Sequence, residues 1–293
     1  VRFQDGANAQ WYLVFGSGPR GAPTQRDAQT SFTSGESANI FVFDFETNSL
    51  TNTLVPGTDA FVGGVKGMDW NRDYQDDALY FGTIEGSINS PSGRLMRARI
   101  LSDGSLSNIT AVQTGKPFVS KPTMYIDYSG SYWVLAGSGR NFVKEDRDSV
   151  QQNNFYVGFR ETPDTSTAID FSFTPTNLLD TSALGIAISK EGLLINGNQV
   201  GVEDDGEDLR NTTELTNHIR DNYDGWRYTF VENERQYGPT DVLGQTIGFS
   251  SFIPGQDNTN SCDVTDQSRI YYFDVNYGLS SRYSPAVRNR DIV

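Results

Sequence analysis

The residues of this chain that are best suited to chemistry form one short run of oxygen-bearing side chains. It reads DWNRDYQDD over residues 69–77, which places Asp, Asn, Asp and Asp at positions 1, 3, 5 and 9. Ca²⁺ takes about six to eight oxygen ligands, and carboxylates this close together repel one another unless a cation lies between them. The spacing therefore predicts a calcium site whose ligands are Asp69, Asn71, Asp73 and Asp77, with Gln75 contributing its main-chain carbonyl.

The same run departs from an EF-hand at two positions. Position 6, which is usually a Gly at the sharp turn, is Tyr74, and position 12, where an EF-hand has a bidentate Glu, is Tyr80 inside an expected strand. The site is therefore not an EF-hand, and Asp77 is the expected bidentate ligand. The alternative interpretation is an acidic, solvated turn that holds no metal.

Other site chemistries are limited by a single cysteine, Cys262, and a single histidine, His218. Neither an internal disulfide nor a zinc site of about four Cys and His ligands can form. His218 lies in TNHIR, residues 216–220, and no serine in the chain has a nucleophile-elbow motif around it. We expect a surface or loop histidine, no catalytic residues and no enzyme activity.

Charge and hydropathy exclude further classes of protein. Lys and Arg number 23 against 37 Asp and Glu, a net charge of −14, so we expect no nucleic-acid surface. No apolar run reaches the ~18 residues of a transmembrane span. The chain begins with Val and has no signal peptide, which indicates a processed or truncated piece of a longer protein.

The elements that must position the acidic run have an all-β pattern. Helical periodicity is nearly absent outside residues 214–221. Most apolar runs are short, alternate with polar residues and are rich in Val, Ile, Phe, Tyr and Trp. Asp-Gly and Asn-Gly turns separate them, for example at residues 103–104 and 196–197.

A two-strand pattern then repeats along the chain. The run WYLVFGSG at residues 11–18 recurs as YWVLAGSG at 132–139, with looser copies at 78–83, 192–197 and 246–251. A second strand follows each copy, at residues 39–44, 93–98, 154–159, 225–230 and 269–274. The repeat predicts a β-propeller in a single domain, with units 1–60, 61–116, 117–184, 185–244 and 245–293. A β-sandwich is the alternative.

The wheel of a propeller closes so that its edges are not exposed. Five units that begin in mid-pattern therefore indicate that upstream blades are absent. The Gly that ends each first strand fits a close approach between strands near the axis.

The remaining motifs are expected to be structural. The acidic run at residues 203–208 and the mixed-charge run at 144–148 are typical of solvated surface loops. Trp11, Trp70, Trp133 and Trp226 are expected to be packing residues rather than the floor of a cofactor site.

The order of these motifs resembles the C-terminal β-propeller of the PilY-type proteins, which are type IV pilus biogenesis factors and tip-associated adhesins. The stretch MDWNRDYQDDALYFGTIEG, residues 68–86, resembles that family's calcium loop and the strand after it. The other segments that carry the resemblance are residues 11–18, 39–50, 93–100, 137–156, 225–227, 246–254, Cys262 and 270–274.

The resemblance implies a roughly seven-bladed, quinoprotein-like propeller whose first blades are absent here. It places the family's calcium ligands on Asp69, Asn71, Asp73 and Asp77. It also implies a non-catalytic function in which calcium occupancy regulates pilus extension against retraction, with a contribution to adhesion or twitching motility. The implied location is extracellular, at the pilus tip or the outer-membrane surface of a Gram-negative bacterium. The implied partners are minor pilins or a tip complex, host or surface ligands, and an upstream segment of the same protein.

Two other functions stay open. A quinoprotein-like dehydrogenase would need a quinone and a metal at the propeller axis, and its absorption spectrum would reveal the quinone. A calcium-dependent glycan-binding adhesin would show chelator-sensitive binding on a glycan array. Cys262 has a loop-like flank, and a disulfide to an upstream segment is compatible with it.

Overall fold

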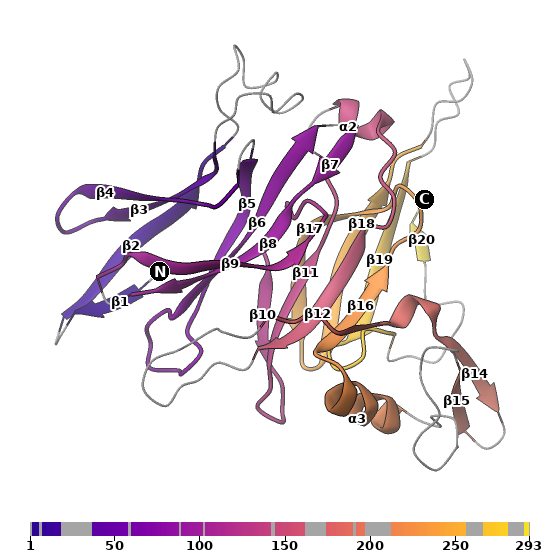
Figure 1. Ribbon diagram of the computed structural model, residues 1–293. Coiled ribbons are helices and arrows are strands. Elements are labelled where there is room, and N and C mark those ends of the chain that lie inside the picture. Colours follow the sequence, from indigo (N-terminus) through magenta and orange to yellow (C-terminus); the bar gives the residue numbers. More distant parts are fainter. Residues whose placement is uncertain are drawn as a thin grey trace.

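The computed structural model is mostly β-structure, as the strand pattern predicts (Figure 1). Two short α-helices accompany the strands in the part of the chain that the structure describes. That part comprises residues 2–5, 8–18, 37–57, 60–87, 89–101, 103–141, 144–161, 174–189, 192–196, 212–255, 266–280 and 290–292.

The first two sheets are built from consecutive antiparallel strands. The first sheet has the order β1-β2-β3-β4, with bounds Arg2–Asp5, Asn8–Gly16, Asn39–Asp44 and Ser49–Leu54. The second sheet has the order β5-β6-β8-β9, and β7 pairs with β6. Its strands are Ala60–Met68, Ala78–Ser87, Arg94–Ile100 and Leu106–Thr114, with β7 at Ser90–Ser92.

The third and fourth sheets continue this order. The third sheet runs β10-β11-β12-β16-β13, with bounds Thr123–Ile126, Tyr132–Gly137, Phe155–Glu161, Gly225–Thr229 and Leu178–Asp180. The fourth runs β17-β18-β19-β20, with bounds Arg235–Leu243, Thr246–Ile253, Gln267–Asp274 and Arg290–Ile292. The remaining elements are the hairpin β14–β15 (Gly185–Ser189, Gly192–Asn196), the 3-10 turn Thr181–Ala183 and the helices α2 (Lys144–Asp148) and α3 (Thr212–Asn222).

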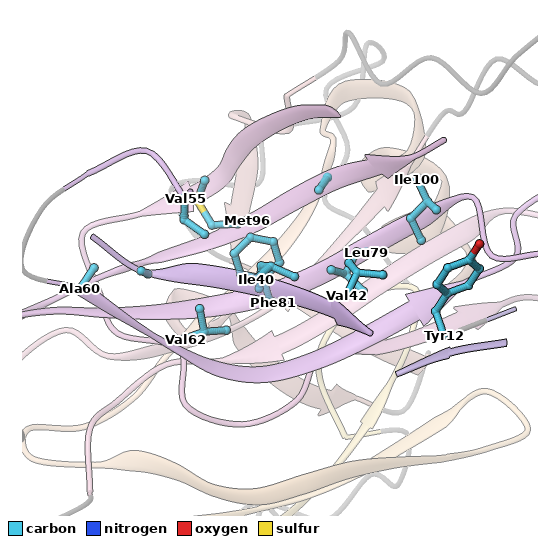
Figure 2. Packing of buried hydrophobic residues seen from close by; sticks show 12 residues of the cluster. Tyr12, Ile40, Val42, Val55, Ala60, Val62, Leu79, Phe81, Met96 and Ile100 are labelled. Carbon is cyan, nitrogen blue, oxygen red and sulfur yellow. The ribbon is translucent and has the colours of Figure 1, made fainter. Parts of the chain in front are cut away.

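Each sheet packs on the next through side chains that alternate between the two faces of its strands. In β6, Leu79 and Phe81 pack on the first sheet, whereas Ala78 and Tyr80 pack on the third. Figure 2 shows the cluster between the first and second sheets, where Ile40 and Val42 of β3 lie beside Leu79 and Phe81. Strands that are apolar on both faces are typical of sheets covered on both sides.

The repeat predicted from the sequence is confirmed for four of its five strand pairs. Neighbouring antiparallel strands β2 and β3, β6 and β8, β11 and β12, and β18 and β19 contain the four predicted pairs. The pairing of residues 192–197 with 225–230 is wrong. Strand β15 pairs with β14, and β16 pairs with β12 inside the third sheet. The described residues thus form four large sheets in series and a separate hairpin, and a closed propeller wheel with its blade count stays a prediction.

The Gly at the end of the repeated first strand does mark a close approach. A Cβ added at Gly82 would overlap the main-chain oxygen of Phe118, which precedes the third sheet. A Cβ at Gly16 or Gly137 would likewise overlap Val62 or Gln236 of the following sheets, at 2.3 and 2.4 Å. Because a side chain at these positions would push neighbouring sheets apart, glycine is required where they meet.

The helices confirm one prediction and correct another. Helix α3 covers the predicted segment 214–221 and buries Leu215 and Ile219. The run 144–148, expected as a solvated loop, instead forms α2, and Asp146 in it is fully buried. Its carboxylate pairs with the buried Arg140 at 2.5 Å, which compensates the charge.

Neither helix in the described part of the chain has the length and apolar character that crossing a membrane requires.

Candidate metal centre

The acidic run forms the loop that connects β5 to β6, so it lies within the second sheet rather than between two sheets. The Asp77 amide donates to the Met68 carbonyl at 2.8 Å and closes the loop, and the Asp77 carbonyl accepts from the Ile100 amide at 2.9 Å. The side chain of Trp70 is fully buried beside Tyr80 and Tyr132, with ring centroids 6.0 and 5.0 Å away. One end of the loop is therefore fixed in the interface between the second and third sheets.

Asp69 organises the first half of the loop. Its Oδ1 accepts hydrogen bonds from the amides of Arg72 at 2.6 Å and Asp73 at 3.2 Å, and its Oδ2 accepts from the Tyr74 amide at 2.7 Å. Three amides on one carboxylate wrap the chain around it, in the manner of an Asx turn.

Asn71, Asp73 and Gln75 are brought together by the same turn. The Asn71 side chain accepts from the Asp73 amide at 2.9 Å and donates to Asp73 Oδ2 at 3.1 Å. Asp73 also accepts from the Gln75 amide at 2.9 Å and from its side-chain amide at 3.3 Å. Four of the five predicted ligands thus belong to one hydrogen-bonded turn.

Asp77 closes the other side of the loop and is half-buried. Its Oδ2 accepts from the amides of Trp70 at 2.7 Å and Asn71 at 3.3 Å. Burial raises the pKa of Asp77 to about 6; these hydrogen bonds oppose the shift, and the charges of Asp73 and Asp69 add to it. The charges of Asp69 and Asp73 thus reach the Asp77 carboxylate and disfavour its ionised form.

The loop makes its sharp turn without glycine. Tyr74, at position 6, has φ = 70°, and Arg72 has φ = 63°. L-residues in this left-handed region carry a cost of about 1–2 kcal/mol each, whereas Gly adopts it freely. Tyr74 thus adopts the left-handed backbone conformation that a glycine usually provides at this position, and its side chain is 78% exposed.

Tyr74→Gly is expected to raise the free energy of unfolding by about 0.5–1 kcal/mol, because relief of backbone strain outweighs the greater freedom of Gly in the unfolded chain. Urea denaturation of the two proteins in the presence of chelator measures the difference. Glycine at exposed Tyr128 is the matched control, since that residue has no positive φ, and it should not stabilise. Destabilisation by Tyr74→Gly would contradict the strained turn.

The donors of the loop suit a hard cation, although they do not form a finished cage. Nowhere in the described residues do three or more His, Cys, Asp or Glu side chains form a group that could hold a metal ion. The oxygens of Asp69, Asp73 and Asp77 face main-chain amides instead. A carboxylate has about four lone-pair sites, however, so these hydrogen bonds leave acceptor capacity on each. Three carboxylates, one amide oxygen and a main-chain carbonyl are the ligand types that Ca²⁺ prefers.

Tyr80, whose ring contacts Trp70 of the loop, belongs to a buried polar group that sequence reasoning missed. The Tyr80 hydroxyl donates to Glu161 Oε1 at 2.8 Å, and Arg97 Nη1 contacts both Glu161 oxygens at 2.8 Å. Arg97 and Glu161 come from the second and third sheets and are each 1% exposed. Burial raises the pKa of Glu161, and the Arg97 charge opposes that shift. Strand residues 64 positions apart give no local signal of such a pair.

His218, the single histidine of the chain, is placed by helix α3. It lies on α3 rather than in a loop, half-buried, with its ring tilted against Tyr223 at 5.7 Å. Its Nδ1 is 3.4 Å from the Asn222 side-chain nitrogen. Cys262 and the acidic run 203–208 lie outside the described residues.

Comparisons with known proteins find similarity among solved structures. No protein-family model matches the chain, and no curated protein matches it. The crystal structure of the Pseudomonas aeruginosa PilY1 C-terminal domain is similar with a TM-score of 0.49 and 16% sequence identity. The similarity covers 86% of this chain and 59% of that one, so this chain spans less than two thirds of its length. The similar structure is from the family that the order of motifs resembles.

Proposed function

We propose that this chain is a calcium-binding, non-catalytic β-propeller domain of a type IV pilus-associated surface protein. Calcium occupancy would regulate pilus extension against retraction at this domain. The observation that carries the proposal is the loop between β5 and β6, where one turn gathers Asp69, Asn71, Asp73 and Gln75 and is closed by Asp77. The pilus function comes from the resemblance of the ordered motifs to the PilY-type domains.

In the proposed site, calcium relieves the repulsion between carboxylates. Asp69, Asp73 and Asp77 carry three negative charges within nine residues, and the charges of the first two already act on the third. A divalent cation bound to them converts this repulsion into attraction, so the loop is held more tightly in the bound state.

The loop can pass its state to the body of the domain through Trp70. Trp70 directly precedes Asn71 in the sequence. Its side chain lies between Tyr80 of the second sheet and Tyr132 of the third. Loosening of the loop would disturb that packing. A partner that binds one state of this surface better than the other would then be regulated by calcium, which is the requirement for a switch.

The experiment that tests this function introduces a single substitution in the loop, in the bacterium that makes the protein. Asp73→Ala is expected to abolish the response of surface piliation and twitching to calcium, because it removes a carboxylate at the middle of the loop. Asp103→Ala is the matched control: Asp103 also holds a turn, through the Ser105 amide at 2.9 Å and hydroxyl at 2.6 Å. Equal piliation and twitching in both variants and the parent would contradict the proposed function.

A further inference from the structure

A polar cleft of about 340 Å³ lies where the segment before β10 meets the first residues of β17. The residues that line it include Val119, Ser120, Lys121, Asn141, Gln236 and Pro239. Its volume is within the range of about 300–1,000 Å³ that is typical of ligand pockets. None of these residues belongs to the acidic loop at 69–77, so the cleft is separate from the proposed calcium site.

The walls of the cleft are fixed by main-chain contacts between sheets. The Gly64 amide of β5 donates to the Val119 carbonyl at 2.9 Å, and a Cβ at Gly64 would overlap the main chain of Lys121. On the other wall, the Gln236 amide donates to the Ser138 carbonyl at 3.0 Å. The cleft is therefore formed before a ligand arrives, which lowers the cost of binding.

Strand β17 departs from its regular ladder at the cleft. Its register with β18 shifts between Tyr237 and Asp241, and Gly238 in this stretch has φ = 83°. The shift takes Gly238 and Pro239 out of the ladder, and both residues line the cleft. Bulges of this kind are common beside functional sites, where they redirect the chain.

Lys121 gives the cleft a positive charge. It is exposed and is the single charged residue among the described residues that line the cleft. In the described part of the chain its ammonium group has no carboxylate partner, and the side chains of Ser120 and Asn141 make no hydrogen bond. The chain as a whole carries a net charge of −14. One lysine against that background favours a ligand with a single negative charge, such as a carboxylate, over a phosphate dianion.

Gln236 supplies a buried hydrogen-bond acceptor to the same cleft. Its side chain is 5% exposed, and its Nε2 donates to the Gly238 carbonyl at 3.2 Å and to the Thr240 hydroxyl at 3.1 Å, which fixes the orientation of the amide. Its Oε1 has no donor among the described residues. A buried acceptor without a donor is unfavourable, so an N–H from a ligand is favoured beside it.

We propose that this cleft binds the C-terminal carboxylate of a partner polypeptide. The carboxylate pairs with Lys121 and accepts from Asn141, and the N–H of the last peptide group donates to Gln236. The terminal side chain lies against the apolar surfaces of Val119 and Pro239. A polypeptide C-terminus combines the single negative charge, the adjacent N–H and the apolar group that the cleft requires. The inference depends neither on calcium nor on a pilus function.

Titration of the purified 293-residue chain with N-acetyl-alanyl-valine, followed by NMR chemical shifts in the presence of chelator, tests the site. Two matched probes accompany it: the C-terminal amide, which lacks the charge, and the analogue methylated on the valine nitrogen, which lacks the N–H. Lys121→Met removes the positive charge of the cleft, and Lys121→Arg keeps it. Lys66→Met is the control variant, because Lys66 of β5 is also exposed and does not line the cleft.

The acid is expected to bind the parent, Lys121→Arg and Lys66→Met. The amide probe, the methylated probe and Lys121→Met should each weaken binding at least about tenfold, because each removes a charged or buried hydrogen bond. No binding of the acid to the folded parent at millimolar concentration would overturn the inference, as would equal binding of acid and amide or unchanged affinity in Lys121→Met. Equal binding of the methylated probe would also overturn it, because the site would then take a simple carboxylate rather than a peptide terminus.

Discussion

Arg97→Met is expected to lower the free energy of unfolding by about 3–5 kcal/mol at pH 7, because it leaves the Glu161 carboxylate buried without its counter-charge. Both side chains are 1% exposed, and both Glu161 oxygens lie 2.8 Å from Arg97 Nη1. Methionine keeps much of the apolar volume of the arginine stem, so packing accounts for little of the loss. Urea denaturation of parent and variant measures the difference.

The charge assignment has its own control. In the double variant Arg97→Met, Glu161→Gln, no charge is buried, and Tyr80 keeps a side-chain oxygen to which it can donate. At least half of the lost stability should therefore return.

The loss of stability in Arg97→Met should also depend on pH. Burial raises the pKa of Glu161 above its unfolded value, so the protonated, neutral form favours folding. The single variant should therefore approach the parent as the pH falls, and a loss independent of pH would contradict an uncompensated charge.

Trp70→Ala is expected to cost about 3–5 kcal/mol, the usual loss when a buried tryptophan is truncated. Trp70 is 0% exposed and packs between the second and third sheets. Trp11 is 61% exposed, which contradicts its expected packing role. Trp11→Ala therefore makes the same chemical change at the surface of the first sheet and should change stability by about 0.5 kcal/mol or less in the isolated chain. Chemical denaturation of both variants gives the comparison. Equal losses would show that Trp70 does not fix the loop in the core.

The same variant tests the connection between the loop and the sheets. Trp70→Ala keeps every proposed calcium ligand, so a change in calcium affinity would come only through the position of the loop. We expect weaker binding, because the freed loop must be ordered by the ion. Unchanged affinity in a folded Trp70→Ala protein would mean that the loop is organised by its own hydrogen bonds alone.

Local sequence signals predicted the strands well. The short apolar runs at residues 11–16, 78–83, 132–137 and 246–251, with a glycine at or near the end of the first three, predicted four central strands and their neighbours correctly. Local signals were sufficient for these strands because the two strands of each predicted pair are close together in the sequence. Residues 225–230 were correctly predicted to contain a strand, but its predicted pairing was wrong, since its partner β12 lies more than sixty residues earlier and no local pattern marks that pairing.

The position of the loop was predicted from the sequence, whereas its surroundings were not. Spacing placed Asp69, Asn71 and Asp73 in one turn, which the hydrogen bonds confirm. The left-handed turn at Tyr74 was not predicted, because that residue type rarely adopts it. Asp146 was taken for a solvated residue, since a mixed run of charges does not reveal that Arg140 is buried beside it.

Calorimetric titration of the chain and of Asp73→Ala with CaCl₂, together with melting curves in calcium and in chelator, tests the central claim most directly. The account predicts one micromolar site that is lost in the variant. It also predicts a calcium-dependent rise in melting temperature, corresponding to about 2.7 kcal/mol at a calcium concentration 100 times Kd. Absence of binding in the folded parent, or equal binding by Asp73→Ala, would contradict the calcium site and leave the loop as an acidic turn.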